Sequence, residues 1–239
     1  MSAEEASFDA WIKLYRPDEN SINSSISYYD KGEILGLLLD LDIRRRTHNT
    51  RSLDDVIRYL YSEFFKKGRN YTPADFQNAC ELMAGASLDQ FFARYVRGRD
   101  DLEPVYNQML AGAGLRLETL GPGGKAEVKA FLGADVSQNN DRLLITSVRA
   151  GSPAYEQGLN ANDQILALDG ARVTKETFEA RLAERKPGDM VHITVFRFDD
   201  LRTLDIRLGA DSRDPFHIVP LPQVKDEQKR VYQSWLGED

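Results

Sequence analysis

Two adjacent tyrosines, Tyr28 and Tyr29, are the residues of this sequence that are best placed to do chemistry. They precede the segment Glu33 to Leu41, in which nearly every side chain is apolar. A helix that is apolar on nearly all sides has to be buried. Its first turn would therefore hold two phenol groups on a rigid support, as a functional group requires. The alternative is that both rings simply pack in the core.

The elements around this helix predict a helical subdomain. Apolar side chains recur at helical spacing from Ser7 to Tyr15. Ser52, Thr72 and Ser87 each precede a further apolar stripe and fit the N-cap position. A last helix is expected from about Leu102 to Ala111. Five or six helices with short connections make a small bundle, and we interpret their aromatic stripes as core rather than as a ligand pocket.

Two other features of this half have a structural and a functional interpretation. The triplet Arg44 to Arg46 ends the apolar helix, where cations complement the helix dipole. We expect this triplet in solvent, although it could also bind an anion. Cys80, the single cysteine, is expected to be a small core residue, because no histidine can be nominated as its base.

Composition excludes some classes of function. The chain has 239 residues, of which 41% are hydrophobic and 29% are charged, and its net charge is −7. These fractions are those of a soluble globular protein, and no basic segment suits a nucleic acid. No apolar run approaches the roughly 20 residues that span a bilayer, and no signal peptide opens the chain. We expect a cytoplasmic location, or a periplasmic one if a longer parent carries a signal peptide.

Residues around the tyrosine pair carry a family resemblance. The segments Ala10 to Pro17, Tyr28 to Gly32 and Leu39 to Arg46 resemble the glycyl aminopeptidases, which are zinc metallopeptidases of the gluzincin group with a C-terminal PDZ domain. The resemblance implies that Tyr29 stabilises the tetrahedral oxyanion opposite the zinc, with Asp30 in place of the family's glutamate. Tyr28 would orient the substrate or pack.

The zinc motif of that family is missing from this chain. It is a His-Glu-x-x-His helix that precedes the tyrosine, whereas His48, His192 and His217 lie far apart. We therefore expect no metal site and no cofactor in this chain, and zinc in a full-length parent. The chain is either the C-terminal piece of that parent or a remnant that has lost its chemistry.

The second half predicts a mixed α and β domain. From Leu115 the apolar pattern changes from helical to alternating. Expected strands are Val128 to Leu132, Leu143 to Val148, Gln164 to Leu168, Val191 to Phe198 and Leu201 to Leu208, with Asp199-Asp200 as the last hairpin connection. The fold class is thus α+β: a helical part over 1–114 that ends a gluzincin catalytic domain, a PDZ-like domain over 115–210, and a tail with a short helix over 211–239.

Four segments in order resemble a circularly permuted PDZ domain. They are Phe131 to Ala134, Ser152 to Leu159, Asn162 to Gly170 and Thr174 to Ala183. Such domains add an extended peptide to a sheet edge while loop amides hold its terminal carboxylate. The resemblance assigns the amides to Leu132, Gly133 and Ala134, and the pocket walls to Phe131, Phe178 and Leu182. An unused or self-blocked groove is the alternative.

Two hypotheses follow from these observations. In the first, the chain is the C-terminal part of a zinc aminopeptidase. Its partners are then a peptide substrate or a C-terminal peptide ligand, and the upstream catalytic domain of the same parent. In the second, it is a non-catalytic protein that binds peptides through its PDZ half.

Overall fold

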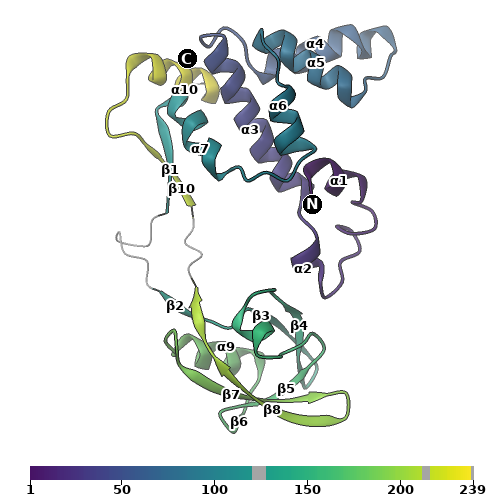
Figure 1. Ribbon diagram of the computed structural model, residues 1–239, viewed down its shortest axis with the longest axis vertical. Helices are drawn as coiled ribbons and strands as arrows, with labels where there is room; N and C mark the ends of the chain where they lie inside the picture. Colours follow the sequence, from purple (N-terminus) through teal and green to yellow (C-terminus); the bar gives the residue numbers. More distant parts are fainter. Residues whose placement is uncertain (120–127, 212–215, 238–239) are drawn as a thin grey trace. The chain divides into compact units, whose positions relative to one another are not determined.

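The computed structural model describes residues 1–119, 128–211 and 216–237. It contains both helices and sheet, and the α+β class predicted from the sequence is confirmed (Figure 1). Contacts divide the chain into two units. The helical unit comprises Met1–Ala10, Ile26–Thr119 and Phe216–Asp239. The sheet unit comprises Trp11–Ser25 and Leu120–Pro215.

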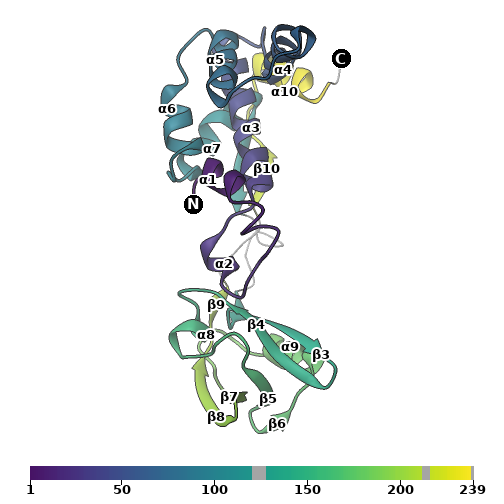
Figure 2. The same cartoon turned by 90° about the vertical axis from the view of Figure 1, so that its right-hand side faces the viewer.

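The helical unit is a bundle around one long helix, α3 (Tyr28–Arg46). Its other elements are α1 (Ala3–Phe8), α4 (Leu53–Glu63), η1 (Phe65–Lys67), α5 (Pro73–Ala84), α6 (Asp89–Phe91), the π-helical turn η2 (Phe92–Val96), α7 (Glu103–Leu110), η3 (Ala111–Ala113), α10 (Asp226–Leu236), β1 (Leu115–Thr119) and β10 (Phe216–Pro220). Figure 1 shows α7 and α10 on one side of α3 and the helices α4 to α6 on the other, and Figure 2 shows the same helices turned by 90°.

The apolar helix is buried, as the sequence predicts. Leu38, Leu39, Leu41 and Ile43 are among its core residues, together with side chains from α4, α5 and α7. Ser27 caps its start, because the Ser27 hydroxyl accepts a hydrogen bond from the Asp30 amide at 3.2 Å. The helix therefore begins at a defined residue and is held by its buried side chains.

Two of the three predicted caps, Ser52 and Thr72, lie at helix starts, whereas α6 begins at Asp89 after Leu88, so Ser87 is not its N-cap. The amide of Ser52 donates to Asp55, and the amide of Thr72 donates to Asp75, each across three residues. Cys80 lies in the core on α5, and burial raises the pKa of its thiol to about 12. Its burial confirms that Cys80 is a core residue, and the raised pKa disfavours the reactive thiolate form.

The helix predicted from Ser7 to Tyr15 is wrong. Helix α1 ends at Phe8, and residues 9 to 14 form turns. The helix buries its alanines, Ala3 and Ala6, instead of the aromatic stripe that suggested it. Phe8 and Trp11 are both largely exposed.

A two-stranded sheet belongs to the helical unit. Strand β1 pairs antiparallel with β10, so that Leu115 lies opposite Pro220. The alternating pattern that begins at Leu115 does form a strand, but this strand lies with the helices and not in the second unit. The sequence could not show this, because the partner strand is about 100 residues away in the chain.

The sheet unit is built on a six-stranded antiparallel sheet in the order β3-β4-β5-β7-β8, with β6 paired to β5. Its elements are α2 (Ser21–Ser24), β2 (Lys129–Phe131), β3 (Ala134–Asn139), β4 (Arg142–Val148), α8 (Pro153–Glu156), β5 (Gln164–Leu168), β6 (Ala171–Arg172), α9 (Lys175–Ala183), β7 (Met190–Arg197), β8 (Asp200–Arg207) and β9 (Gly209–Asp211). Strand β2 pairs with β9 apart from this sheet. The core includes Leu143, Ile165 and Val191.

The last hairpin is shifted by one residue from its predicted connection. Its turn consists of Phe198 and Asp199, and Asp200 already belongs to β8. Phe198 has a φ of 54°, a left-handed conformation that is uncommon for a bulky residue. Sequence reasoning chose the two aspartates because such turns normally favour small polar residues.

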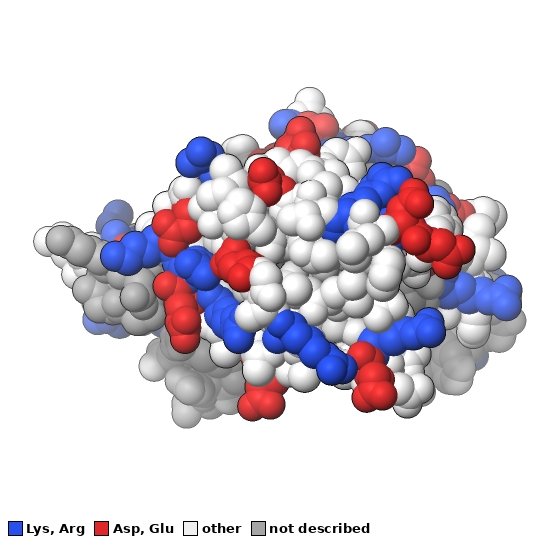
Figure 3. All heavy atoms as spheres, turned by 90° about the horizontal axis from the view of Figure 1, so that it is seen from below, with Lys and Arg blue, Asp and Glu red and all other residues white. Residues whose placement is uncertain are grey.

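No helix of the described residues is long and apolar enough to cross a membrane. On the face drawn in Figure 3, basic and acidic side chains alternate around an uncharged area.

Candidate functional site

The two tyrosines occupy the first two positions of α3, directly after the Ser27 cap. Their ring centroids are 4.1 Å apart and the rings are inclined by 30°. Tyr28 is half-buried, whereas Tyr29 is 58% exposed. The Tyr29 ring therefore packs against the Tyr28 ring, and much of the Tyr29 side chain stays accessible to solvent.

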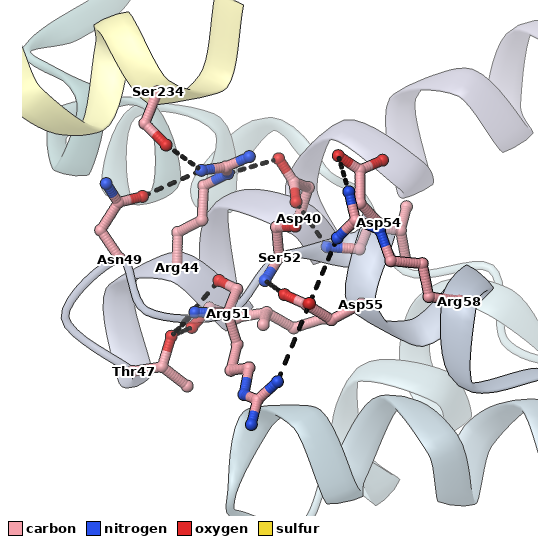
Figure 4. Close-up of polar contacts among 12 residues, drawn as sticks. Asp40, Arg44, Thr47, Asn49, Arg51, Ser52, Asp54, Asp55, Arg58 and Ser234 are labelled. Carbon is pink, nitrogen blue, oxygen red and sulfur yellow. Dashed lines mark hydrogen bonds and ion pairs between the residues drawn. The ribbon is translucent and has the colours of Figure 1, made fainter. Parts of the chain in front are cut away.

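A buried ion pair holds the other end of the helix. Arg44 Nε lies 2.9 Å from Asp40 Oδ2, and Asp40 Oδ1 accepts a hydrogen bond from the amide of Leu53 at 2.7 Å (Figure 4). Arg44 Nη1 donates to Asn49 Oδ1 and to Ser234 Oγ. One arginine and one aspartate thus join α3 to the start of α4 and to α10.

The prediction that Arg44 to Arg46 are solvated is wrong for Arg44, which is 6% exposed. Arg45 and Arg46 are exposed, and both bind the buried carboxylate of Asp42, at 2.5 and 2.7 Å. The pairs follow the three- and four-residue spacing at which side chains meet on a helix. The triplet therefore fixes the helix instead of offering a free anion site.

Two cavities adjoin α3. One, of about 590 Å³, lies between α3, α4 and α10 and is lined by Asp40, Arg44 and Trp235 among others. The other, of about 440 Å³, adjoins the first turn, where Asp30, Asp101 and Tyr106 contribute to its lining. Burial, with a contribution from Asp101, raises the pKa of the Tyr106 hydroxyl. Sequence reasoning missed Asp101 and Tyr106, because neither lies in a motif.

A second candidate site lies on the sheet unit. Strand β3 is an edge strand of the six-stranded sheet, and α9 packs against β2 and β3. The amide of Lys175, the first residue of α9, donates to Gln138 Oε1 on β3 at 3.0 Å. An edge strand beside a helix is the geometry that receives an added peptide strand.

The carbonyl groups of the loop before β3 accept hydrogen bonds from backbone amides elsewhere in the sheet unit. The amide of Ala154 donates to Leu132 O, and the amide of Arg149 donates to Gly133 O, both at 2.9 Å. Gly133 has a φ of 83°, and a Cβ placed on it would lie 2.1 Å from Ser152 Cβ. Only glycine fits this position, because both the backbone angle and the space exclude a side chain.

The predicted groove residues are placed unequally. Leu132 is buried, while Phe131, Ala134 and Leu182 are half-buried. Phe178 is 1% exposed and belongs to the core. Its ring therefore supports α9 from the inside, and Leu182 is the apolar helix residue that remains partly accessible.

Among the described residues, no group of three or more His, Cys, Asp or Glu side chains could hold a metal ion. His48 Nδ1 lies 4.0 Å from Glu227, and His192 Nδ1 lies 2.7 Å from Asp205, both on the surface. The three histidines are therefore not brought together into a ligand set by the described part of the fold.

Comparison with known families covers both candidate sites. The M61 glycyl aminopeptidase family matches residues 1–35, and the PDZ domain family matches residues 130–208. The chain is thus similar to the M61 glycyl aminopeptidases over residues 1–35, the M61 segment, and to PDZ domains over residues 130–208. The M61 segment includes Tyr28 and Tyr29. The PDZ domain includes the Gly133 loop, β3 and α9.

Solved structures extend this comparison. The crystal structure of an aminopeptidase N family protein from Idiomarina loihiensis has 26% sequence identity and a TM-score of 0.79, and the match covers 97% of this chain and 40% of that chain. The chain thus spans less than half the length of this relative. An HtrA-type protease, AlgW with decapeptide, has 20% identity over 37% of this chain and 31% of its own, with a TM-score of 0.34. No curated protein matches the chain significantly.

Proposed function

We propose that the chain is the C-terminal part of a zinc-dependent aminopeptidase, to which it contributes Tyr29 and a PDZ domain. The observation that carries this proposal is the M61 match over residues 1–35, which includes a tyrosine that is exposed on the first turn of a buried helix. A cytoplasmic location, or a periplasmic one where the complete protein carries a signal peptide, belongs to the same proposal.

The role of Tyr29 is electrostatic. Attack on a peptide carbonyl places a negative charge on its oxygen, and a fixed donor that points at this oxygen stabilises the transition state. The Tyr29 hydroxyl is such a donor, and α3 fixes the backbone from which it projects. Tyr28, which stacks on Tyr29, limits where the ring can move.

Zinc, which the family implies, does not fit the described residues of this chain, since they contain no cluster that could hold a metal ion. Its ligands would be supplied by a part of the peptidase outside this chain. The contribution proposed for this chain is therefore its own tyrosine and its peptide groove.

The proposal is tested with the complete coding sequence. We expect an in-frame His-Glu-x-x-His upstream of residue 1, and a complete protein that releases amino-terminal glycine from a chromogenic glycyl amide. The 239-residue chain alone is expected to show no turnover in the same assay. A coding sequence with no peptidase segment upstream would contradict the proposal.

For the PDZ domain we propose binding of a peptide C-terminus. Chemical-shift mapping of the whole chain with a C-terminal peptide library should show shifts at Leu132 to Ala134 and along α9. Peptides with an amidated C-terminus should bind at least about tenfold more weakly, because the loop amides would lose a charged acceptor. Gly133→Ala should abolish the shifts, since its Cβ has no room beside Ser152.

The matched control for that variant is Gly170→Ala, which also has a positive φ but has no neighbouring atom within 4 Å of its Cβ. It tests the strain of the backbone without the clash, and its peptide binding should persist. Absence of shifts with every peptide would mean that the groove is unused.

A non-catalytic peptide-binding protein is the second candidate function. One observation favours it. The PDZ match covers all the core residues of the sheet unit, whereas the M61 match is limited to residues 1–35. Peptide binding by the chain, together with a coding sequence that has no peptidase segment upstream, would select this alternative.

A further inference from the structure

A segment of the M61 match is fixed to the sheet unit. We define the strap as Trp11–Ser25, which groups with the sheet unit. Its anchor is Asn23, whose Nδ2 donates to Val148 O and whose Oδ1 accepts from the amide of Ala150, both at 2.8 Å. The carboxamide thus pairs with the backbone at the end of β4 as a neighbouring strand would.

The strap exposes three large apolar side chains. Trp11 is 77% exposed, Ile12 is 67% exposed and Tyr15 is 47% exposed. The rings of Trp11 and Tyr15 have centroids 5.0 Å apart, so they form one aromatic surface. Apolar side chains that gather on one short segment in this way mark an interaction site.

The position of these residues in the family match indicates what covers them. All three lie within the M61 segment, and the I. loihiensis relative has a much longer chain than the part that this chain matches. Most of such a peptidase therefore lies outside this chain. Because burial of apolar side chains is favourable, the part of the peptidase outside this chain is the occupant that we assign to this surface.

We propose that Trp11, Ile12 and Tyr15 are the docking surface for the upstream catalytic portion of the peptidase. This inference rests on the proposed function. Since Asn23 anchors the same strap to the backbone beside β4, docking would bind the PDZ domain and the catalytic portion to one segment. Burial of apolar surface supplies the driving force, and the exposed aromatic rings are the type of residue that dominates such interfaces.

The test uses the upstream coding segment, produced as a separate polypeptide and mixed with the 239-residue chain. Trp11 and Trp235 are the two tryptophans, so Trp235→Phe leaves Trp11 as the only reporter in the chain. We expect the fluorescence emission of Trp11 to shift to shorter wavelength on mixing, because its ring would move from water into the interface. Tryptophans of the upstream segment could obscure this fluorescence signal. As a second readout, this chain alone is labelled with 5-fluorotryptophan, and the ¹⁹F NMR resonance of Trp11 is followed.

Affinity measured by calorimetry provides the third readout. Trp11→Ala with Ile12→Ala should weaken binding of the upstream segment at least tenfold. The matched control is Phe198→Ala, which removes a side chain that is 96% exposed on the same unit, and it should bind as the parent chain does. Asn23→Ala should leave docking intact but speed hydrogen exchange of the Ala150 amide, which loses its acceptor.

Several outcomes would overturn the inference. An upstream segment that binds the double variant as tightly as the parent chain would remove the docking surface, while turnover by the mixture would leave the proposed function in place. A shift of the Trp11 signal that depends on the concentration of this chain alone would identify a second copy as the occupant. A complete protein that lacks peptidase activity would reject the proposed function independently of the binding result.

Discussion

Tyr29→Phe in the proposed complete peptidase is expected to lower kcat by at least about tenfold, and by as much as about 10²–10³-fold, the typical loss for one oxyanion donor. The substitution removes the hydroxyl and keeps the ring, so the stacking on Tyr28 and the Ser27 cap should persist. The loss should fall on kcat more than on KM, because the oxyanion exists only in the transition state. Steady-state kinetics on an amino-terminal glycyl amide measure both constants.

Two controls separate this role from a structural one. Zinc content, measured by atomic absorption, should be unchanged, because the described residues near Tyr29 form no metal site. Tyr28→Phe removes the neighbouring hydroxyl from a half-buried ring and should cost much less turnover. An unchanged kcat in Tyr29→Phe would exclude Tyr29 from the mechanism, and loss of zinc would show that it supports the fold.

The burial of α3 could be predicted from the sequence because local chemistry decides it. An apolar run after a serine cap has few alternatives to a buried helix, and the structure places Leu38 and Ile43 in the core. The caps at Thr72 and Ser52 likewise act within three residues of themselves. The positions of α4 and α5 therefore required no knowledge of the tertiary fold.

The surroundings of Arg44 could not be predicted, because they depend on distant partners. A run of three arginines is typical of a solvated helix end, yet Ser234, which accepts from Arg44, lies 190 residues away. The helix predicted from Ser7 to Tyr15 was wrong for a related reason. Helical spacing in a sequence identifies an apolar stripe, but it does not show whether this chain or another segment covers it.

The candidate sites also contain features that the sequence could predict and features that it could not. Tyr29 is exposed on the first turn of α3 and only glycine fits at position 133, but the roles that the resemblance implies for Tyr29 and Gly133 stay predictions. Phe178 does not line the groove, since its side chain faces the core of the sheet unit. Strand β3, which offers the free edge, was absent from the predicted strands because Asp135, Ser137 and Gln138 are polar and exposed. An edge strand with one polar face carries a weak apolar signal.

Asp40→Ala is expected to destabilise the helical unit by about 3–5 kcal/mol, the cost of removing one partner of a buried ion pair. The Asp40 carboxylate accepts from both Arg44 and the amide of Leu53, so the variant leaves a buried guanidinium without its ion-pair partner and the Leu53 amide at the start of α4 without its acceptor. Asn49 and Ser234 still accept from Arg44, but both are neutral and cannot compensate its charge. Urea unfolding followed by Trp235 fluorescence in a Trp11→Phe background measures the change.

An exposed ion pair on α4 provides the control for the stability loss expected in Asp40→Ala. Asp54→Ala removes a carboxylate that is exposed and 4.0 Å from Arg58 on the same helix, and it should cost less than about 1 kcal/mol. Asp40→Leu combined with Arg44→Met should recover most of the lost stability, because an apolar pair of similar volume often replaces a buried ion pair without loss. If Asp40→Ala costs no more than Asp54→Ala, water reaches the pair, and the anchoring of α3 depends on its apolar contacts alone.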